Sequence, residues 1–297
     1  MPSTEHDGIV ALITSEPRRG GSDDPVGEAR QGLDSMGALF AVPEDVAVEP
    51  FTVAGRQAEW LRPSDIEPGR HLLYLHGGAY VAGSLSSHRS LVARLAKTMR
   101  ATAVHLDYGL APEYPFPAGL NDAVALYQLL LSTGVEPKNL IVAGDSAGGG
   151  LSLALALQLR ELGLEGPGAL VLLSPWLDLT MTAPEATALQ ESDPMLSAAS
   201  LLDSAHLYAG DDLENVLVSP INGDFTGLCP SLVFASTTEI LIADTRTFAS
   251  RAAAAGASVT VCEFEGLIHV WPFVDGLPET TAVMEEVNGF IEGHFSN

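Results

Sequence analysis

The stretch that most constrains this chain is a short apolar run that leads straight into a serine turn flanked by glycines. Residues 139–150 read Asn-Leu-Ile-Val-Ala-Gly-Asp-Ser-Ala-Gly-Gly-Gly, and a helix-forming run of small and apolar residues follows over residues 151–164. A serine at so sharp a turn has a strained backbone, and glycines two positions away on either side let strand and helix pass closely. The pattern predicts an exposed Ser146 hydroxyl between a buried strand and a helix. A glycine-rich turn without chemistry has the same pattern, so function depends on partner residues.

The rest of the chain alternates between apolar runs typical of buried strands and amphipathic runs typical of helices. A hairpin of two strands is predicted over residues 46–53 and 56–61. Further strands are predicted over residues 71–75, 102–106, 140–143, 169–173, 232–235 and 258–264. Helices are predicted over residues 87–100, 117–131, 151–164, 243–255 and 279–295. This alternation predicts an α/β fold, with a mostly parallel central sheet and helices on both of its faces.

Two segments fall outside this alternation and predict a helical cap. Residues 176–222 show no strand pattern but carry a helical apolar stripe over residues 198–208. An insertion at the carboxyl ends of parallel strands is where a lid over a site lies. An amphipathic helix that begins after Asp24 and ends before Pro43 is expected to join it. The predicted division is residues 1–45 and 176–222 as cap, and residues 46–175 and 223–297 as catalytic core.

The charge balance argues against two classes of partner. The 297 residues carry 14 basic and 38 acidic side chains, a formal net charge of −24, so nucleic acids and anionic membranes would repel the chain. The apolar run over residues 9–13 is too short for a signal-sequence core or a membrane span. Cys229 and Cys262 are isolated, without the spacing of a disulfide framework or a metal site. A soluble, cytoplasmic protein is expected.

A serine hydroxyl needs a base to become a nucleophile, and His269 is the best placed of the eight histidines. It follows the last predicted strand by a short loop, whereas the others fall in a tail, on helices, in strands or in a glycine turn ahead of the serine. A carboxylate must in turn orient the imidazole. Glu239 lies just after the strand over residues 232–235 and is the expected acid. Asp244 is the alternative, although its position also fits an acid at a helix N-terminus.

Backbone N–H donors for a negatively charged transition state are expected in a second glycine turn. The sequence His-Gly-Gly-Ala-Tyr over residues 76–80 follows directly on the strand over residues 71–75. Glycines let the backbone approach a substrate carbonyl oxygen closely, and the residue after the serine supplies a further N–H. The oxyanion hole is therefore expected to combine N–H groups of this glycine turn with the N–H of Ala147.

Five motifs agree in order and spacing with a known family. They read HGGAY at residues 76–80, DYGLAPEYPFPA at 107–118, GDSAGG at 144–149, SPWLDL at 174–179 and IHVW at 268–271. Together they resemble the hormone-sensitive lipase-like family of bacterial esterases, over roughly residues 24–295. The resemblance implies hydrolysis of short-chain carboxylic esters by an α/β-hydrolase fold with a helical cap and no cofactor. It also implies roles at matching positions, a catalytic triad of Ser146, Glu239 and His269 and an oxyanion hole of Gly77, Gly78 and Ala147.

Three positions depart from the family pattern. Ala79 stands where the family usually has a third glycine; backbone donors tolerate its methyl group, which is expected to narrow the acyl site. Gly109 replaces the arginine usual before Leu-Ala-Pro-Glu, so the local ion pairing of that arginine is expected to be absent. Glu239 occupies a position where aspartate is commoner, and local geometry must absorb its extra methylene group.

The sequence thus predicts a serine carboxylesterase that hydrolyses short-chain esters through an acyl-enzyme. A lactone, carbamate or amide hydrolase would use the same triad, and a non-catalytic receptor would use the same fold. The helix after Asp24 is expected to cover the acyl site. The strand over residues 258–264 is the last of its series and predicts an exposed sheet edge. Members of the family often dimerise through that edge, so a homodimer is expected.

Overall fold

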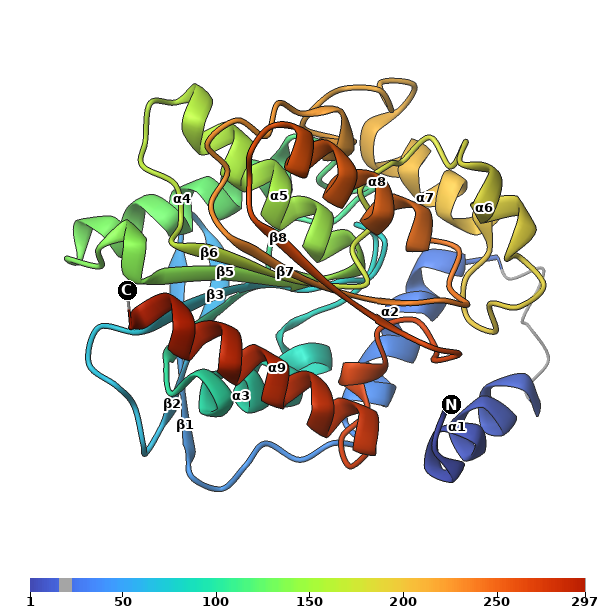
Figure 1. Cartoon of the computed structure of the whole chain (residues 1–297), viewed down its shortest axis with the longest axis horizontal. Coiled ribbons are helices and arrows are strands. Elements are labelled where there is room, and N and C mark those ends of the chain that lie inside the picture. Colours follow the sequence, from blue (N-terminus) through green and yellow to red (C-terminus); the bar gives the residue numbers. More distant parts are fainter. Residues whose placement is uncertain (16–22, 297) are drawn as a thin grey trace.

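Eight strands of the computed structural model, which describes residues 1–15 and 23–296, form one twisted sheet (Figure 1). Their order across the sheet is β1-β2-β4-β3-β5-β6-β7-β8. β2 is antiparallel to both of its neighbours, and every other neighbouring pair is parallel. The strands are β1 (Val46–Val53), β2 (Arg56–Pro63), β3 (His71–Leu75), β4 (Thr102–Leu106), β5 (Leu140–Asp145), β6 (Ala169–Leu173), β7 (Ser231–Ser236) and β8 (Val259–Phe264). The predicted mostly parallel sheet is confirmed.

Local sequence explains both the hairpin and the buried strands. Ala54 and Gly55 connect β1 to β2 with positive φ angles of 51° and 84°, which suit the twist of a two-residue hairpin turn. All six residues of β5 are buried, because helices cover both faces of a parallel sheet. Leu140 and Val142 belong to one apolar cluster, and Ile141 and Ala143 to the cluster on the other side.

Helices cover the two faces of the sheet (Figure 1). One face carries α3 (Leu85–Met99) and α9 (Pro278–Phe295), and the other carries α4 (Ala118–Ser132), α5 (Ser146–Glu161) and α8 (Ile242–Ala254). The start of α3 is fixed by a capping box, in which Ser84 Oγ accepts the N–H of Ser87 and Ser87 Oγ accepts the N–H of Ser84. The helix ends at Arg100, which adopts a left-handed conformation.

Four more helices gather at the end of the sheet where the parallel strands finish (Figure 1). They are α1 (Thr4–Ser15), α2 (Pro25–Gly37), α6 (Pro184–Ala188) and α7 (Ala198–Ala209), and three short 3₁₀ helices complete the described elements, η1 (Pro137–Asn139), η2 (Pro220–Asn222) and η3 (Trp271–Phe273). Asp24 caps α2 by accepting the N–H of Gly27. Within the described ranges, the helices are all too short or too polar to cross a membrane.

Helices α1, α5 and α6 differ most from the sequence expectations, since α6 was not expected and several other elements differ only by a few residues at their ends. α1 was not expected, yet Ile9, Val10 and Ile13 recur at helical spacing and pack against the core. α5 begins at Ser146, five residues earlier than expected, because its glycines pack directly on neighbouring backbone. A Cβ atom on Gly150 would lie 2.3 Å from the carbonyl oxygen of Trp176.

Candidate active site

Ser146 occupies the strained turn that its sequence motif predicts. It is the first residue of α5, directly after β5, and has a φ of 50°. The glycines two positions before and after it are sterically required, since a Cβ on Gly144 would lie 2.3 Å from the carbonyl oxygen of Gly148, and a Cβ on Gly148 would lie 2.0 Å from that of Leu75. A side chain held at positive φ by close packing has little freedom to move. Ser146 is only 7% exposed, so the prediction of an exposed hydroxyl is wrong for this structure, in which the close packing of the turn buries the side chain.

Glu239 and His269 meet in a buried hydrogen bond. His269 Nδ1 lies 2.6 Å from Glu239 Oε2. The other carboxylate oxygen of Glu239 accepts the N–H of Ser236 at 2.8 Å, which fixes the side chain to the end of β7. The extra methylene of glutamate is therefore absorbed by the turn after β7, and the chain order of serine, acid and histidine is that of an α/β hydrolase.

The surroundings of His269 hold its imidazole ready to accept a proton. Burial lowers the pKa of His269, but the hydrogen bond and charge of Glu239 outweigh burial, with smaller contributions from Asp193 and Asp145, and the net shift is upward. Among the residues that the structure describes, Nε2 makes no hydrogen bond. With Nδ1–H donated to Glu239, the lone pair on Nε2 is free to take a proton.

Asp244, the alternative acid, lies in a different set of contacts. Its Oδ2 accepts the N–H groups of Leu177 at 2.7 Å and Asp178 at 2.9 Å. Burial raises the pKa of Asp244 to about 8, although these two hydrogen bonds oppose the shift. Asp244 thus fastens the start of residues 176–222 to α8, and Glu239 is the acid in contact with the imidazole.

Asp193 supports the turn that carries Glu239, and the sequence analysis missed it. Its side chain is buried, and its Oδ2 accepts the N–H of Ile240 at 3.0 Å while its Oδ1 accepts that of Leu196 at 2.8 Å. A carboxylate from the segment 176–222 therefore holds the residue next to the acid. The only sequence signal was an aspartate before a proline, which is more often a turn signal.

The glycine turn after β3 contains one predicted donor of the oxyanion hole that is already paired. The N–H of Gly77 donates to Asp145 Oδ1 at 2.9 Å, so it is not free for a substrate oxygen in this structure. In the described part of the chain, the N–H groups of Gly78 and Ala79 donate to no acceptor. Ala147 lies in the first turn of α5, where N–H groups have no intrahelical acceptor. The available donors are thus those of Gly78, Ala79 and Ala147.

Asp145 connects the serine turn to this glycine turn. Its carboxylate also accepts a hydrogen bond from the Tyr74 hydroxyl at 2.7 Å and lies 3.3 Å from His88 Nε2. Burial would raise the pKa of Asp145, but His88, Tyr74 and the N–H of Gly77 lower it to about 2. The carboxylate is therefore charged and holds two loops of the site together.

Ala79 and Gly109, two departures from the family pattern, have local structural explanations. Ala79 has a φ of 53°, a conformation that favours the glycine usual at this position. Beside Gly109, Asp122 Oδ2 accepts both the Gly109 N–H at 2.9 Å and Arg56 Nε at 2.8 Å. A Cβ on Gly109 would lie 2.4 Å from Arg56 Nη2. The ion pair found beside position 109 is a different one, which Arg56 makes with Asp122.

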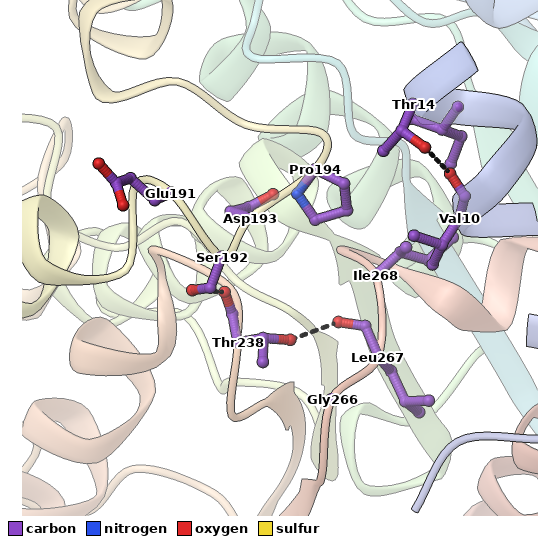
Figure 2. A pocket seen from close by; sticks show the side chains of 11 residues that line it. Val10, Thr14, Glu191, Ser192, Asp193, Pro194, Thr238, Gly266, Leu267 and Ile268 are labelled. Carbon is purple, nitrogen blue, oxygen red and sulfur yellow. Dashed lines mark hydrogen bonds between the residues drawn. The ribbon is translucent and has the colours of Figure 1, made fainter. Parts of the chain in front are cut away.

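A cavity of about 490 Å³ lies between α1 and the loops that follow β7 and β8 (Figure 2). Its walls come from α1, from the segment before α7, from the turn after β7 and from the loop after β8. The lining residues are Val10, Ile13, Thr14, Glu191, Ser192, Asp193, Pro194, Thr238, Gly266, Leu267 and Ile268. Thr238 and Ile268 directly precede Glu239 and His269 in the chain. No three His, Cys, Asp or Glu side chains of residues 1–15 and 23–296 are grouped so as to hold a metal ion.

This fold and this buried histidine–carboxylate pair agree with the known proteins that the chain resembles. A family described by its α/β-hydrolase fold matches residues 72–273, and the chain belongs to that family. An acetyl-hydrolase of Streptomyces hygroscopicus is 39% identical over 278 residues, which cover 93% of this chain and 89% of the relative. An esterase of Acinetobacter venetianus is 33% identical over 264 residues, which cover 88% of this chain and 87% of the relative.

Solved structures narrow the class further. The crystal structure of EstE5 soaked with p-nitrophenyl butyrate matches with a TM-score of 0.94 at 35% identity, covering 99% of this chain and 100% of that chain. An esterase from the bacterial hormone-sensitive lipase family matches with a TM-score of 0.93 at 34% identity, covering 99% of each chain. Within the α/β hydrolases, the protein is therefore a carboxylic ester hydrolase of the bacterial hormone-sensitive lipase-like group.

Proposed function

We propose that Ser146, His269 and Glu239 hydrolyse short-chain carboxylic esters through an acyl-enzyme. The observation that carries this proposal is the buried hydrogen bond of 2.6 Å between Glu239 and His269 Nδ1, which leaves Nε2 as the proton acceptor. Ser146 supplies the nucleophile from its strained turn at the end of β5. The apo site has no hydrogen bond between Ser146 and His269 among the described residues, a contact that often tightens only when substrate binds.

Two half-reactions follow from this assignment. As Ser146 Oγ bonds to the ester carbonyl carbon, its proton passes to His269 Nε2, and the carbon–oxygen bond to the alcohol breaks as His269 returns the proton to the leaving alcohol. Water then attacks the acyl-enzyme, losing a proton to His269, and the carboxylic acid leaves as Ser146 regains its proton. Glu239 stabilises the imidazolium in both steps.

The negative charge on the substrate oxygen is stabilised by backbone N–H groups. Gly78, Ala79 and Ala147 are the proposed donors, because the N–H of Gly77 is occupied by Asp145. The side chain of Ala79 stands in a turn built for glycine, which supports a small acyl group over a long one. The name of the acetyl-hydrolase relative and the p-nitrophenyl butyrate soaked into EstE5 support the same choice.

A series of p-nitrophenyl esters from acetate to dodecanoate, assayed side by side, tests this function. We expect the highest kcat/KM at acetate or butyrate, and a loss on the order of 10³-fold or more in Ser146→Ala. A serine-directed organophosphate should add its mass to the wild type and not to this variant. Activity of Ser146→Ala within about tenfold of wild type would refute the nucleophile. Turnover confined to a lactone, carbamate or amide, or no turnover of any of these, would refute the ester as substrate.

We further propose that the protein acts as a homodimer joined through β8. β8 is an edge strand with only β7 beside it in the described sheet, so its outer backbone groups are open to a second copy. The net charge of −24 opposes this association at low salt. The cytoplasmic location and the lack of nucleic-acid and membrane partners stay predictions from composition.

A further inference from the structure

The loop that carries His269 is fastened to the core on both sides of the imidazole. Before His269, the carbonyl oxygen of Leu267 accepts the Ser236 hydroxyl at 2.6 Å. After it, the N–H of Val270 donates to Ser174 Oγ at 3.2 Å. Each of these contacts comes from the end of a core strand or from the turn that follows it. They fix the backbone two residues before and one residue after the proposed base.

A third contact reaches the same loop from the N-terminal helix. The N–H of Ile268, the residue directly before His269, donates to His6 Nε2 at 2.9 Å. This bond joins residues 262 positions apart in the chain, and it is buried. His6 is 1% exposed and is the one fully buried residue of α1. Helix α1 therefore delivers a hydrogen-bond acceptor to the backbone beside the proposed base.

The docking of α1 holds His6 in this place. Ser3 donates through its N–H and its hydroxyl to the carboxylate of Glu279, at 2.5 and 2.9 Å, which ties the start of α1 to α9. Ile9 and Ile13 pack against the core cluster that also contains Ile268. The imidazole thus reaches Ile268 from a helix that is anchored by contacts of its own.

His6 accepts a hydrogen bond only in its neutral form, and its surroundings favour that form. Burial is the largest effect and lowers the pKa of His6, while the charges of Glu279 and Asp7 oppose it. Because Nε2 accepts the N–H of Ile268, the proton of the neutral ring lies on Nδ1, 4.0 Å from Asp7 Oδ1. Among the described residues, Nδ1 has no hydrogen-bond partner, so the contact with Ile268 is the hydrogen bond that the imidazole makes.

We propose that His6 is a positioning residue for His269, which holds the loop in register by accepting the N–H of Ile268. The proposal rests on the proposed role of His269 as the base. Without the acceptor, a buried N–H is left unpaired, and the loop must move to pair it. Displacing a catalytic base by about 1 Å lowers the rate on the order of 10²-fold. Loss of the hydrogen bond between His6 and Ile268 is therefore expected to slow the reaction, although His6 lies outside the triad.

Two substitutions in the full-length protein separate the hydrogen bond from simple packing. His6→Leu fills the site without an acceptor, whereas His6→Gln places an amide oxygen where Nε2 lies. On p-nitrophenyl butyrate, His6→Leu should lower kcat by about tenfold or more with little change in KM, because the chemical step and not binding is affected. His6→Gln should restore most of the lost kcat. Leu12→Ala is the matched control, since Leu12 lies on the exposed side of the same helix and its replacement leaves the contacts of His6 in place.

Hydrogen exchange measures the hydrogen bond between Ile268 and His6 independently of activity. The Ile268 amide should be protected in the wild type and in His6→Gln, and should exchange faster in His6→Leu. The proposal is overturned if His6→Leu keeps wild-type kcat, if His6→Gln is as impaired as His6→Leu, or if Leu12→Ala loses as much kcat as His6→Leu. A wild type that hydrolyses no ester refutes the proposed function; loss of Ile268 protection in His6→Leu would still support the contact between His6 and the loop.

Discussion

The hydrogen bond between Glu239 and His269 sets the pH range of the proposed reaction. The imidazole must be neutral to accept the serine proton, and its pKa lies above its ordinary value of 6.5 because Glu239 outweighs burial. We therefore expect kcat/KM to fall as the pH decreases through this raised pKa. In Glu239→Gln the charge of Glu239 is gone and burial is opposed only by the smaller contributions of Asp193 and Asp145, so the acidic limb of the residual activity should move to lower pH. Measuring kcat/KM against pH for both proteins tests this expectation. An acidic limb at the same pH in both proteins would contradict it.

Glu239 and Asp244 offer a matched comparison of two buried carboxyl groups on neighbouring turns. Glu239→Gln removes the charge that stabilises the imidazolium, and we expect kcat/KM to fall on the order of 10³-fold. Asp244→Asn keeps an oxygen for the N–H groups of Leu177 and Asp178, and should change kcat/KM by less than about threefold. Steady-state kinetics on one short-chain ester decide between them. The reverse ranking would move the acid to Asp244.

The residues of the site were predictable from sequence where a motif fixes their backbone. Ser146 lies between two glycines that admit no side chain, and His269 and Glu239 follow strands whose ends meet at one edge of the sheet. The pairing of the Gly77 N–H was not predictable from sequence, because which N–H groups stay free depends on where nearby side chains point. Asp145 turns back to that N–H, and nothing in a linear pattern specifies this contact.

Helices α1 and α2 both contact loops of the proposed active site. Removing residues 1–41, which include both helices, tests what these contacts contribute. Arg30 of α2 donates to the carbonyl oxygens of Val81 and Ala111, next to the glycine turn, and His6 of α1 bonds to Ile268. Since every strand lies beyond residue 45, we expect the core to fold and kcat/KM to fall by about tenfold or more. Circular dichroism checks the fold. A folded truncated protein with full kcat/KM would show that neither helix contributes.

Elements were predictable to within a few residues wherever hydrophobic periodicity met a turn signal. β3, β4 and β6 have the bounds that the apolar runs predict, because buried parallel strands read as continuous apolar segments. α1 was overlooked because its apolar residues form one short run over residues 9–13 and most of its other residues are exposed, Glu5 and Asp7 among them. Its helix is held by tertiary contacts such as the one between His6 and Ile268, which periodicity does not reveal.

At the level of the whole molecule, the open edge of β8 predicts association. Thr260 is an exposed residue of this strand, and a charge on an edge strand disfavours pairing with another edge. We expect light scattering to give the mass of a dimer for the wild type, with the dimer strengthened by salt as repulsion is screened. Thr260→Glu should shift the mass toward a monomer. A wild type that is monomeric at every salt concentration would refute the dimer.

The ion pair of Arg56 beside Gly109 couples positions 56 and 109, so a substitution at one changes what the other can accept. Arg56 Nη2 lies where a side chain at 109 would begin, and Arg56 also stacks on the Tyr114 ring and pairs with Asp122. An arginine brought into position 109 from a relative would meet this guanidinium and displace it from both partners. Replacing Arg56 first removes this conflict. Consensus engineering that tests arginine at position 109 alone would reject it. The same substitution is expected to succeed when Arg56 is replaced beforehand.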